Sequence, residues 1–122
     1  MKTTRTLAMI EFGNALRTAR EEKNARLLDL SDLIGVSVPF LSDVENGRRP
    51  LSDERIETLA AHLGADPLPL KILASKYRGK IELDISGSSQ QEIEAALVLA
   101  RSWRQVPAAT VNHILTELKK SA

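Results

Sequence analysis

The residues whose types and spacing point most clearly to a chemical role lie in one stretch, residues 28–50. Two short apolar helices are predicted to meet there, at Gly35, Val36 and Ser37. A turn of about three or four residues holds the second helix at a steep angle to the first. Such a second helix can enter a major groove of DNA while the first braces against the backbone. The chemistry that this spacing favours is hydrogen bonding and apolar contact with base edges.

Bond-making chemistry has no comparable support in the sequence. His62 and His113 are far apart and have no cysteine near them, because the chain contains none. Zinc sites need several such ligands at short spacing. The serines at 86–89 lie in a turn and at a helix start, where no motif supplies a base to activate them. We therefore predict no catalytic residue, no metal site and no cofactor, and we expect a protein that is not an enzyme.

The amino-acid composition and net charge argue against several kinds of binding partner. The 122 residues carry 17 Lys and Arg against 16 Asp and Glu, a net charge of +1, which is unlike a non-specific nucleic-acid coater. Aromatic residues are only 3%, too few for the stacking platform of a single-strand binder. The longest apolar run, residues 95–100, is far short of a membrane span, and no secretory signal is recognisable. We therefore expect a cytoplasmic protein without membrane contact.

Five short helices are predicted over residues 7–78 to position the central stretch. Gly35 suits the left-handed end of one helix, and Ser37 suits the cap of the next, with Pro39 tolerated in its first turn. Leu41 and Val44, three residues apart, anchor this helix and leave its other side outward. Gly13 interrupts the first helix as a tolerated flaw.

The rest of the chain, residues 79–122, follows a different pattern. Residues 80–86 alternate apolar and polar, with Ile81, Leu83 and Ile85 on one side, which predicts a half-buried β-strand. Ser89 and Glu92 have capping-box spacing at the start of a helix to about residue 104, and a last helix follows Pro107. The fold class expected is mainly α-helical, with a five-helix domain followed by a short β-strand and two helices.

The central stretch resembles the Cro and phage-repressor type of helix-turn-helix domain, the XRE family. The matching features lie within residues 12–70: Gly-Val-Ser at 35–37, Phe-Leu-Ser at 40–42, Val-Glu-Asn-Gly-Arg-Arg-Pro at 44–50, and a short helix that ends in Leu-Gly at 63–64. The resemblance covers about half of the chain. It implies a λ-repressor-like fold and binding to double-stranded DNA at a palindromic operator.

The resemblance also implies roles for particular residues. Arg20 would pair with Glu45 beneath the DNA-facing surface and set the tilt of two helices, although an ordinary surface ion pair is the alternative. Phosphate contacts are implied for Arg26, Asn46, Arg48 and Arg49. Base-facing positions are implied for Ser37, Val38, Pro39, Ser42 and Asp43.

The base-facing set departs from the family, because it lacks Arg, Lys and Gln, the usual bidentate readers of guanine and adenine. Val38 and Pro39 can pack on thymine methyl groups. Ser42 can serve either base, and Asp43 can accept from cytosine N4, although its charge repels phosphate. The operator sequence is left open.

Two copies are expected to bind together, because one such helix contacts only a few base pairs. We expect Ile81, Leu83 and Ile85 to form the dimer interface as a two-chain ribbon, with the terminal helices packed across it. An extended linker over residues 80–86 is the alternative.

The function expected is a homodimeric, sequence-specific transcriptional regulator, a repressor. The rival is an antitoxin that binds DNA through residues 7–78 and neutralises a protein partner through residues 79–122.

Overall fold

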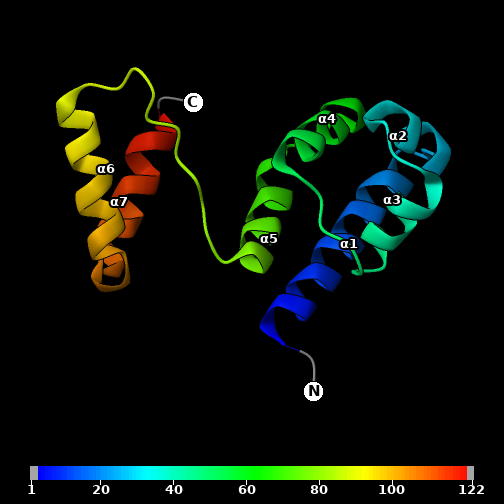
Figure 1. The fold of residues 1–122 in the computed structure, drawn as a ribbon, viewed down its shortest axis with the longest axis horizontal. Coiled ribbons are helices and arrows are strands. Elements are labelled where there is room, and N and C mark those ends of the chain that lie inside the picture. Colours follow the sequence, from blue (N-terminus) through cyan, green and yellow to red (C-terminus); the bar gives the residue numbers. More distant parts are fainter. Residues whose placement is uncertain (1–2, 121–122) are drawn as a thin grey trace. The chain divides into compact units, whose positions relative to one another are not determined.

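The computed structural model describes residues 3–120, and these form seven α-helices and one short 3-10 helix (Figure 1). The helices are α1 (Thr4–Glu22), α2 (Leu27–Ile34), α3 (Val38–Glu45), α4 (Asp53–Leu63), α5 (Leu68–Arg78), α6 (Gln90–Ser102) and α7 (Ala108–Lys120), with η1 (Trp103–Gln105) between the last two. The chain divides into two compact units, one that reaches Glu82 and one that begins at Leu83. The described helices include none that is long and apolar enough to cross a membrane.

The first unit is built around α1, which packs against both α5 and α3. In turn α2 packs against α3 and α4. Phe12 of α1 meets Tyr77 of α5 edge to face, with ring centroids 5.7 Å apart. The Tyr77 hydroxyl donates to the carbonyl of Leu51 and accepts from its N–H, each at 3.0 Å, so the segment after α3 is tied to α5. The buried apolar side chains of this core are Ala8, Phe12, Leu16, Leu30, Leu41, Val44, Leu51, Ile56, Leu59, Ala60, Leu63, Leu70, Ala74 and Tyr77.

Gly13 has a structural role that its sequence context hides. A Cβ at this position would lie 2.6 Å from the backbone oxygen of Val44 and closer still to that of Glu45. The interpretation of Gly13 as a tolerated flaw was therefore wrong. The absent side chain is what lets α1 approach the end of α3.

The predicted β-strand over residues 80–86 is not present among the described residues, so this part of the fold-class prediction was wrong. Ile81 and Leu83 are 83% and 71% exposed, in a segment without regular secondary structure. A strand is stabilised by hydrogen bonds to a neighbouring strand, and no second strand is formed in the described chain. The alternating pattern alone cannot supply that partner.

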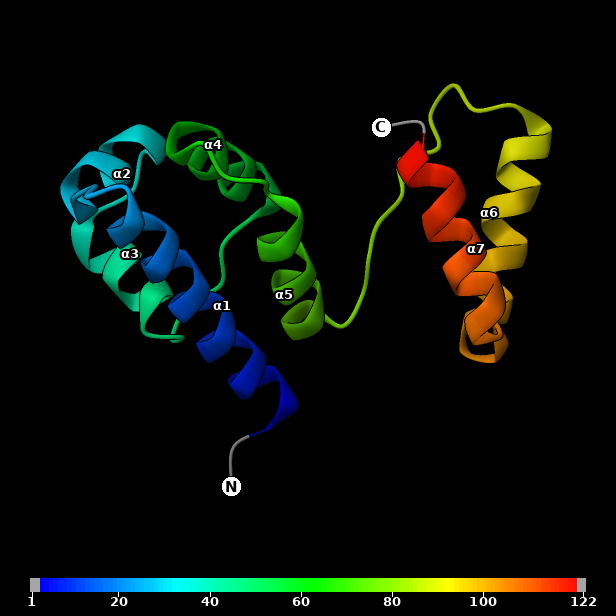
Figure 2. The same cartoon turned by 180° about the vertical axis from the view of Figure 1, so that it is seen from behind.

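The second unit is an antiparallel helical hairpin, in which α6 runs one way and α7 returns after η1 (Figure 2). The start of α6 is fixed by hydrogen bonds between residues close in sequence. Ser89 accepts from the N–H of Glu92 at 3.1 Å, and Glu92 accepts from the N–H of Ser89 at 2.9 Å, which confirms the predicted capping box. Hydrogen bonding from Ser89, first of all from its backbone N–H, lowers the pKa of the Glu92 carboxyl.

Candidate nucleic-acid interface

The turn between α2 and α3 sets the direction of α3. Gly35 ends α2 with φ +69°, a left-handed conformation that other residues adopt only with strain. The N–H of Val36 donates back to the carbonyl of Ser31 at 3.0 Å. Ser37 then caps α3, its side chain accepting from the N–H of Phe40 at 3.1 Å. Both ends of the turn are therefore fixed by hydrogen bonds, as the sequence predicted.

One side of α3 is anchored in the core, and the other side is available to a partner. Leu41 and Val44 are fully buried, and Glu45 is 2% exposed. The five positions assigned to base contact lie outside this anchor. Ser37 and Pro39 are exposed, and Val38, Ser42 and Asp43 are partly buried.

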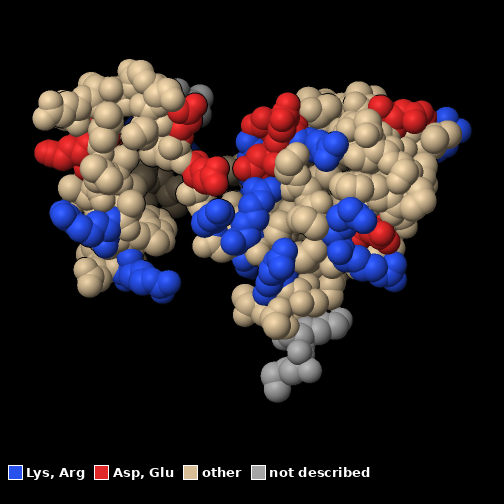
Figure 3. All heavy atoms as spheres, viewed as in Figure 1, with Lys and Arg blue, Asp and Glu red and all other residues tan. Residues whose placement is uncertain are grey.

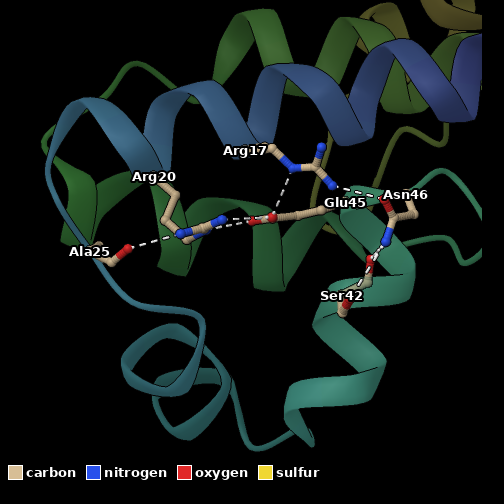
Figure 4. Close-up of polar contacts among 6 residues, drawn as sticks. All are labelled: Arg17, Arg20, Ala25, Ser42, Glu45 and Asn46. Atoms are coloured by element: carbon tan, nitrogen blue, oxygen red, sulfur yellow. Dashed lines mark hydrogen bonds and ion pairs between the residues drawn. The ribbon is translucent and has the colours of Figure 1, made fainter.

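The buried carboxylate of Glu45 holds two arginines of α1 (Figure 4). Arg20 donates to it twice, from Nε at 2.7 Å and from Nη2 at 3.0 Å. Arg17 donates from Nε at 3.4 Å. The hydrogen bond to Glu45 raises the pKa of Arg20 above its ordinary value, so this side chain stays charged. The bidentate pair ties the end of α3 to α1 and restricts the tilt of α3.

Arg20 also reaches beyond Glu45. Its Nη1 donates to the carbonyl of Ala25 at 3.0 Å (Figure 4), which fixes the connection between α1 and α2. One guanidinium thus links α1, the connection to α2 and the end of α3. Such an arrangement positions the α2–α3 pair as a rigid element.

Asn46 is held in the same network and caps the end of α3. Its Oδ1 accepts from Nη2 of Arg17 at 2.8 Å, and its Nδ2 donates to the carbonyl of Ser42 at 2.9 Å (Figure 4). The reasoning from sequence missed Arg17. The signal was present, because Arg17 and Arg20 are three residues apart and share a face of one helix.

The loop after α3 places its arginines in two different ways. Arg48, with 71% of its side chain exposed, lies 3.5 Å from the Asp43 carboxylate, so the acidic group in the base-facing set is partly neutralised. The guanidinium of Arg49 lies over the Phe40 ring, 4.6 Å from its centroid. Arg55 of α4 is also over that ring at 5.8 Å. The sequence analysis predicted no stacking on Phe40 and assigned no role to Arg55, because this contact depends on where α4 lies relative to α3.

Arg26 lies at the start of α2 and is paired with Asp29 by two hydrogen bonds of 3.1 and 2.9 Å. The pairing lowers the pKa of Asp29. Both side chains are exposed, so the pair contributes little to stability and can open at small cost.

Charge is unevenly spread over the first unit. In Figure 3 the acidic spheres of this unit lie mainly over α2 and α4, and basic spheres gather where α1, α5 and the α3–α4 connection lie. The described residues contain no cluster of side chains suited to hold a metal ion. The arrangement as a whole offers a braced helix with arginines beside it. Such an arrangement can bind an anionic groove.

The braced helix α3 and the arginines beside it are typical of helix-turn-helix DNA-binding proteins. Comparison with known proteins gives the same class. Residues 11–71 match the model of a helix-turn-helix domain. The chain belongs to this family, which confirms the resemblance to XRE-type regulators. The family and the curated relative below are helix-turn-helix regulators, which are not enzymes.

One curated relative is the HTH-type transcriptional regulator DdrOP3 of Deinococcus deserti, 43% identical over 49 residues. The match covers 40% of this chain and 38% of that regulator. Among solved structures, the clp gene regulator ClgR of Corynebacterium glutamicum is 26% identical, with a TM-score of 0.50, over 80% of this chain and 93% of that one. The restriction-modification controller protein C.AhdI of Aeromonas hydrophila is 31% identical, with a TM-score of 0.49, over 52% of this chain and 97% of that one.

Proposed function

We propose that this chain is a sequence-specific double-stranded DNA-binding transcription regulator that acts as a homodimeric repressor. The observation that carries the proposal is the clamp on Glu45. A buried carboxylate held by Arg17 and Arg20 fixes α3 while its outer side stays open to solvent. A helix presented in this way can lie in a major groove.

Phosphate contacts position the domain on the duplex and supply most of the salt-dependent affinity. The residues proposed for this role are Arg26, Asn46, Arg48 and Arg49. Arg26 and Arg48 are both exposed, and each is paired with a carboxylate that solvent reaches, so either can turn toward a phosphate at small cost. Arg17 is 39% exposed and adds positive charge beside Asn46.

Base contacts supply the sequence preference. Val38 and Pro39 can contact thymine methyl groups, Ser42 can donate or accept, and Asp43 can accept from cytosine N4. Ser37 completes the set at the start of α3. The interaction of Asp43 with Arg48 reduces the repulsion between this acid and the DNA backbone, so that an acid can remain in the base-facing set.

Two copies are needed to read an operator of useful length. A palindromic operator presents two half-sites to two α3 helices. Occupation of such a site at a promoter excludes polymerase, which is the basis of the proposed repression. Ile81, Leu83 and Ile85 are exposed and open to contacts with a second copy, although they form no strand.

The test begins with selection of bound fragments from random and genomic DNA by the purified protein. A palindromic consensus is the expected result, and the absence of any enriched sequence would refute the proposal. Binding of the consensus is then measured at several salt concentrations for Arg48→Ala/Arg49→Ala. Loss of two phosphate contacts should weaken binding to all sequences and reduce the salt slope by about 1.8.

Lys119→Ala/Lys120→Ala is the matched control, because it removes the same charge from the end of α7. Its salt slope should stay close to that of the unmodified chain. Equal slopes for the two double variants would show that the loop after α3 does not contact phosphate.

A further inference from the structure

The second unit exposes apolar side chains that its own residues do not cover. No described residue of this unit is buried. On α6, Leu97 is 66% exposed and Val98 is 45% exposed. Residues 95–100, the longest apolar run of the sequence, are not buried within one chain. This much exposed apolar surface on a two-helix hairpin is typical of a site that binds a partner.

A shallow groove runs along α6 and shows what kind of partner fits. Its lining residues are Gln90, Ile93, Glu94, Leu97, Val98 and Arg101. The centre of the groove is apolar, at Leu97 and Val98. Glu94 lies three residues before Leu97, and Arg101 lies three residues after Val98. Opposite charges therefore stand at equal distances from the centre.

This arrangement is self-complementary about a two-fold axis. In an isologous interface each residue meets a counterpart from the same patch of the other copy. If two α6 helices cross antiparallel with the axis between Leu97 and Val98, Glu94 faces Arg101 of the partner subunit, and Leu97 faces Val98 of the partner subunit. A parallel crossing would instead set like charges against each other.

We propose that α6 pairs antiparallel with α6 of a second copy of this chain, and that this groove forms the helical part of the dimer interface. The proposal rests on the proposed function for its biological purpose, since it names the surface that joins two DNA-binding units. The balance of charge in the second unit favours a second copy of the same unit as the partner. Residues 83–120 contain four acidic and four basic side chains, so two copies of the unit do not repel. The acids are Asp84, Glu92, Glu94 and Glu117, and the bases are Arg101, Arg104, Lys119 and Lys120.

The test is a pair of charge reversals in the full chain, measured without DNA by sedimentation equilibrium. Glu94→Arg places two arginines opposite each other at both ends of the interface, and Arg101→Glu places two glutamates there. Each variant alone should dissociate at a concentration at least about tenfold higher than the unmodified dimer. Circular dichroism checks that both variants keep their helices.

Mixing the two variants gives the decisive measurement. In a heterodimer both reversed positions meet an opposite charge again, so the mixture should associate nearly as tightly as the unmodified chain. The double variant Glu94→Arg/Arg101→Glu should also recover, because both pairs are restored within its homodimer. A merely structural role within one chain would not be rescued by mixing.

Glu117→Arg and Lys119→Glu are the matched controls on α7, and they should leave association unchanged. A chain that is monomeric at about 100 μM, single variants that dimerise normally, or a mixture that fails to recover would each overturn the interface. The outcome is separable from that of the DNA selection. Dimerisation that ignores the reversals, together with an intact consensus, would refute this interface alone.

Discussion

Gly13 of α1 lies directly against the backbone carbonyls of Val44 and Glu45 at the end of α3. The same turn of α3 carries the Glu45 side chain to Arg20, at 2.7 Å. The close approach and the ion pair therefore depend on one helix crossing. This crossing sets how α3 is presented.

Gly13→Ala should lower the free energy of unfolding by about 2 kcal/mol, because backbone atoms cannot move aside as a flexible side chain would. Urea denaturation measures the change. Asn14→Ala, on the exposed side of the same helix, is the control and should have almost no effect. Unchanged stability of Gly13→Ala would show that the crossing can widen freely.

Glu45→Ala should destabilise the first unit by about 3 kcal/mol, since it leaves the mostly buried Arg20 without its carboxylate. Arg17→Ala should cost less than about 1 kcal/mol, because Arg17 is 39% exposed and its contact is longer. Thermal unfolding of both variants tests the order. Equal losses would mean that Arg17 rather than Arg20 supplies the stabilisation by this carboxylate.

Tyr77→Phe removes a hydroxyl that makes two hydrogen bonds to the backbone of Leu51. The buried N–H of Leu51 then lacks a partner, so the free energy of unfolding should fall by about 1–3 kcal/mol. The ring contact with Phe12 is preserved in this variant, which isolates the hydroxyl. A neutral result would indicate that water replaces it.

Val38→Ala should change the preferred base at one position of each half-site and leave the salt slope as it is, because no charge is removed. Repeated selection of bound DNA with the variant, alongside salt titration, gives both quantities. An unaltered consensus would exclude Val38 from base contact.

The capping box of α6 should make the stability of the second unit depend on pH. The pKa of Glu92 in the folded chain lies below its ordinary value near 4.5, because its carboxylate accepts hydrogen bonds from Ser89. The stabilisation is therefore fully present above that ordinary value and is lost as the pH falls through the lowered pKa. Helix content, followed by circular dichroism from pH 6 to about pH 2, should fall less steeply for Glu92→Gln, which keeps a hydrogen-bond acceptor without the charge.

Capping and turn residues in the sequence predicted the succession of helices along the chain and several helix boundaries. Gly35 at the end of α2, Ser37 at the start of α3 and the Ser89–Glu92 box all involve residues within four positions of one another. Such hydrogen bonds form wherever the local backbone turns, so the residue types alone are informative. The pairing of Arg20 with Glu45 was available only through the resemblance to a known family.

Contacts between distant segments were beyond the reach of residue patterns. The need for glycine at position 13 and the second arginine on Glu45 both arise where α1 meets the end of α3, a segment far along the chain from it. Residues 80–86 are the converse case, because their alternation has the period of a strand but no neighbouring strand to complete it. Periodicity describes which face of a segment is apolar, whereas packing depends on which other surface arrives at that face.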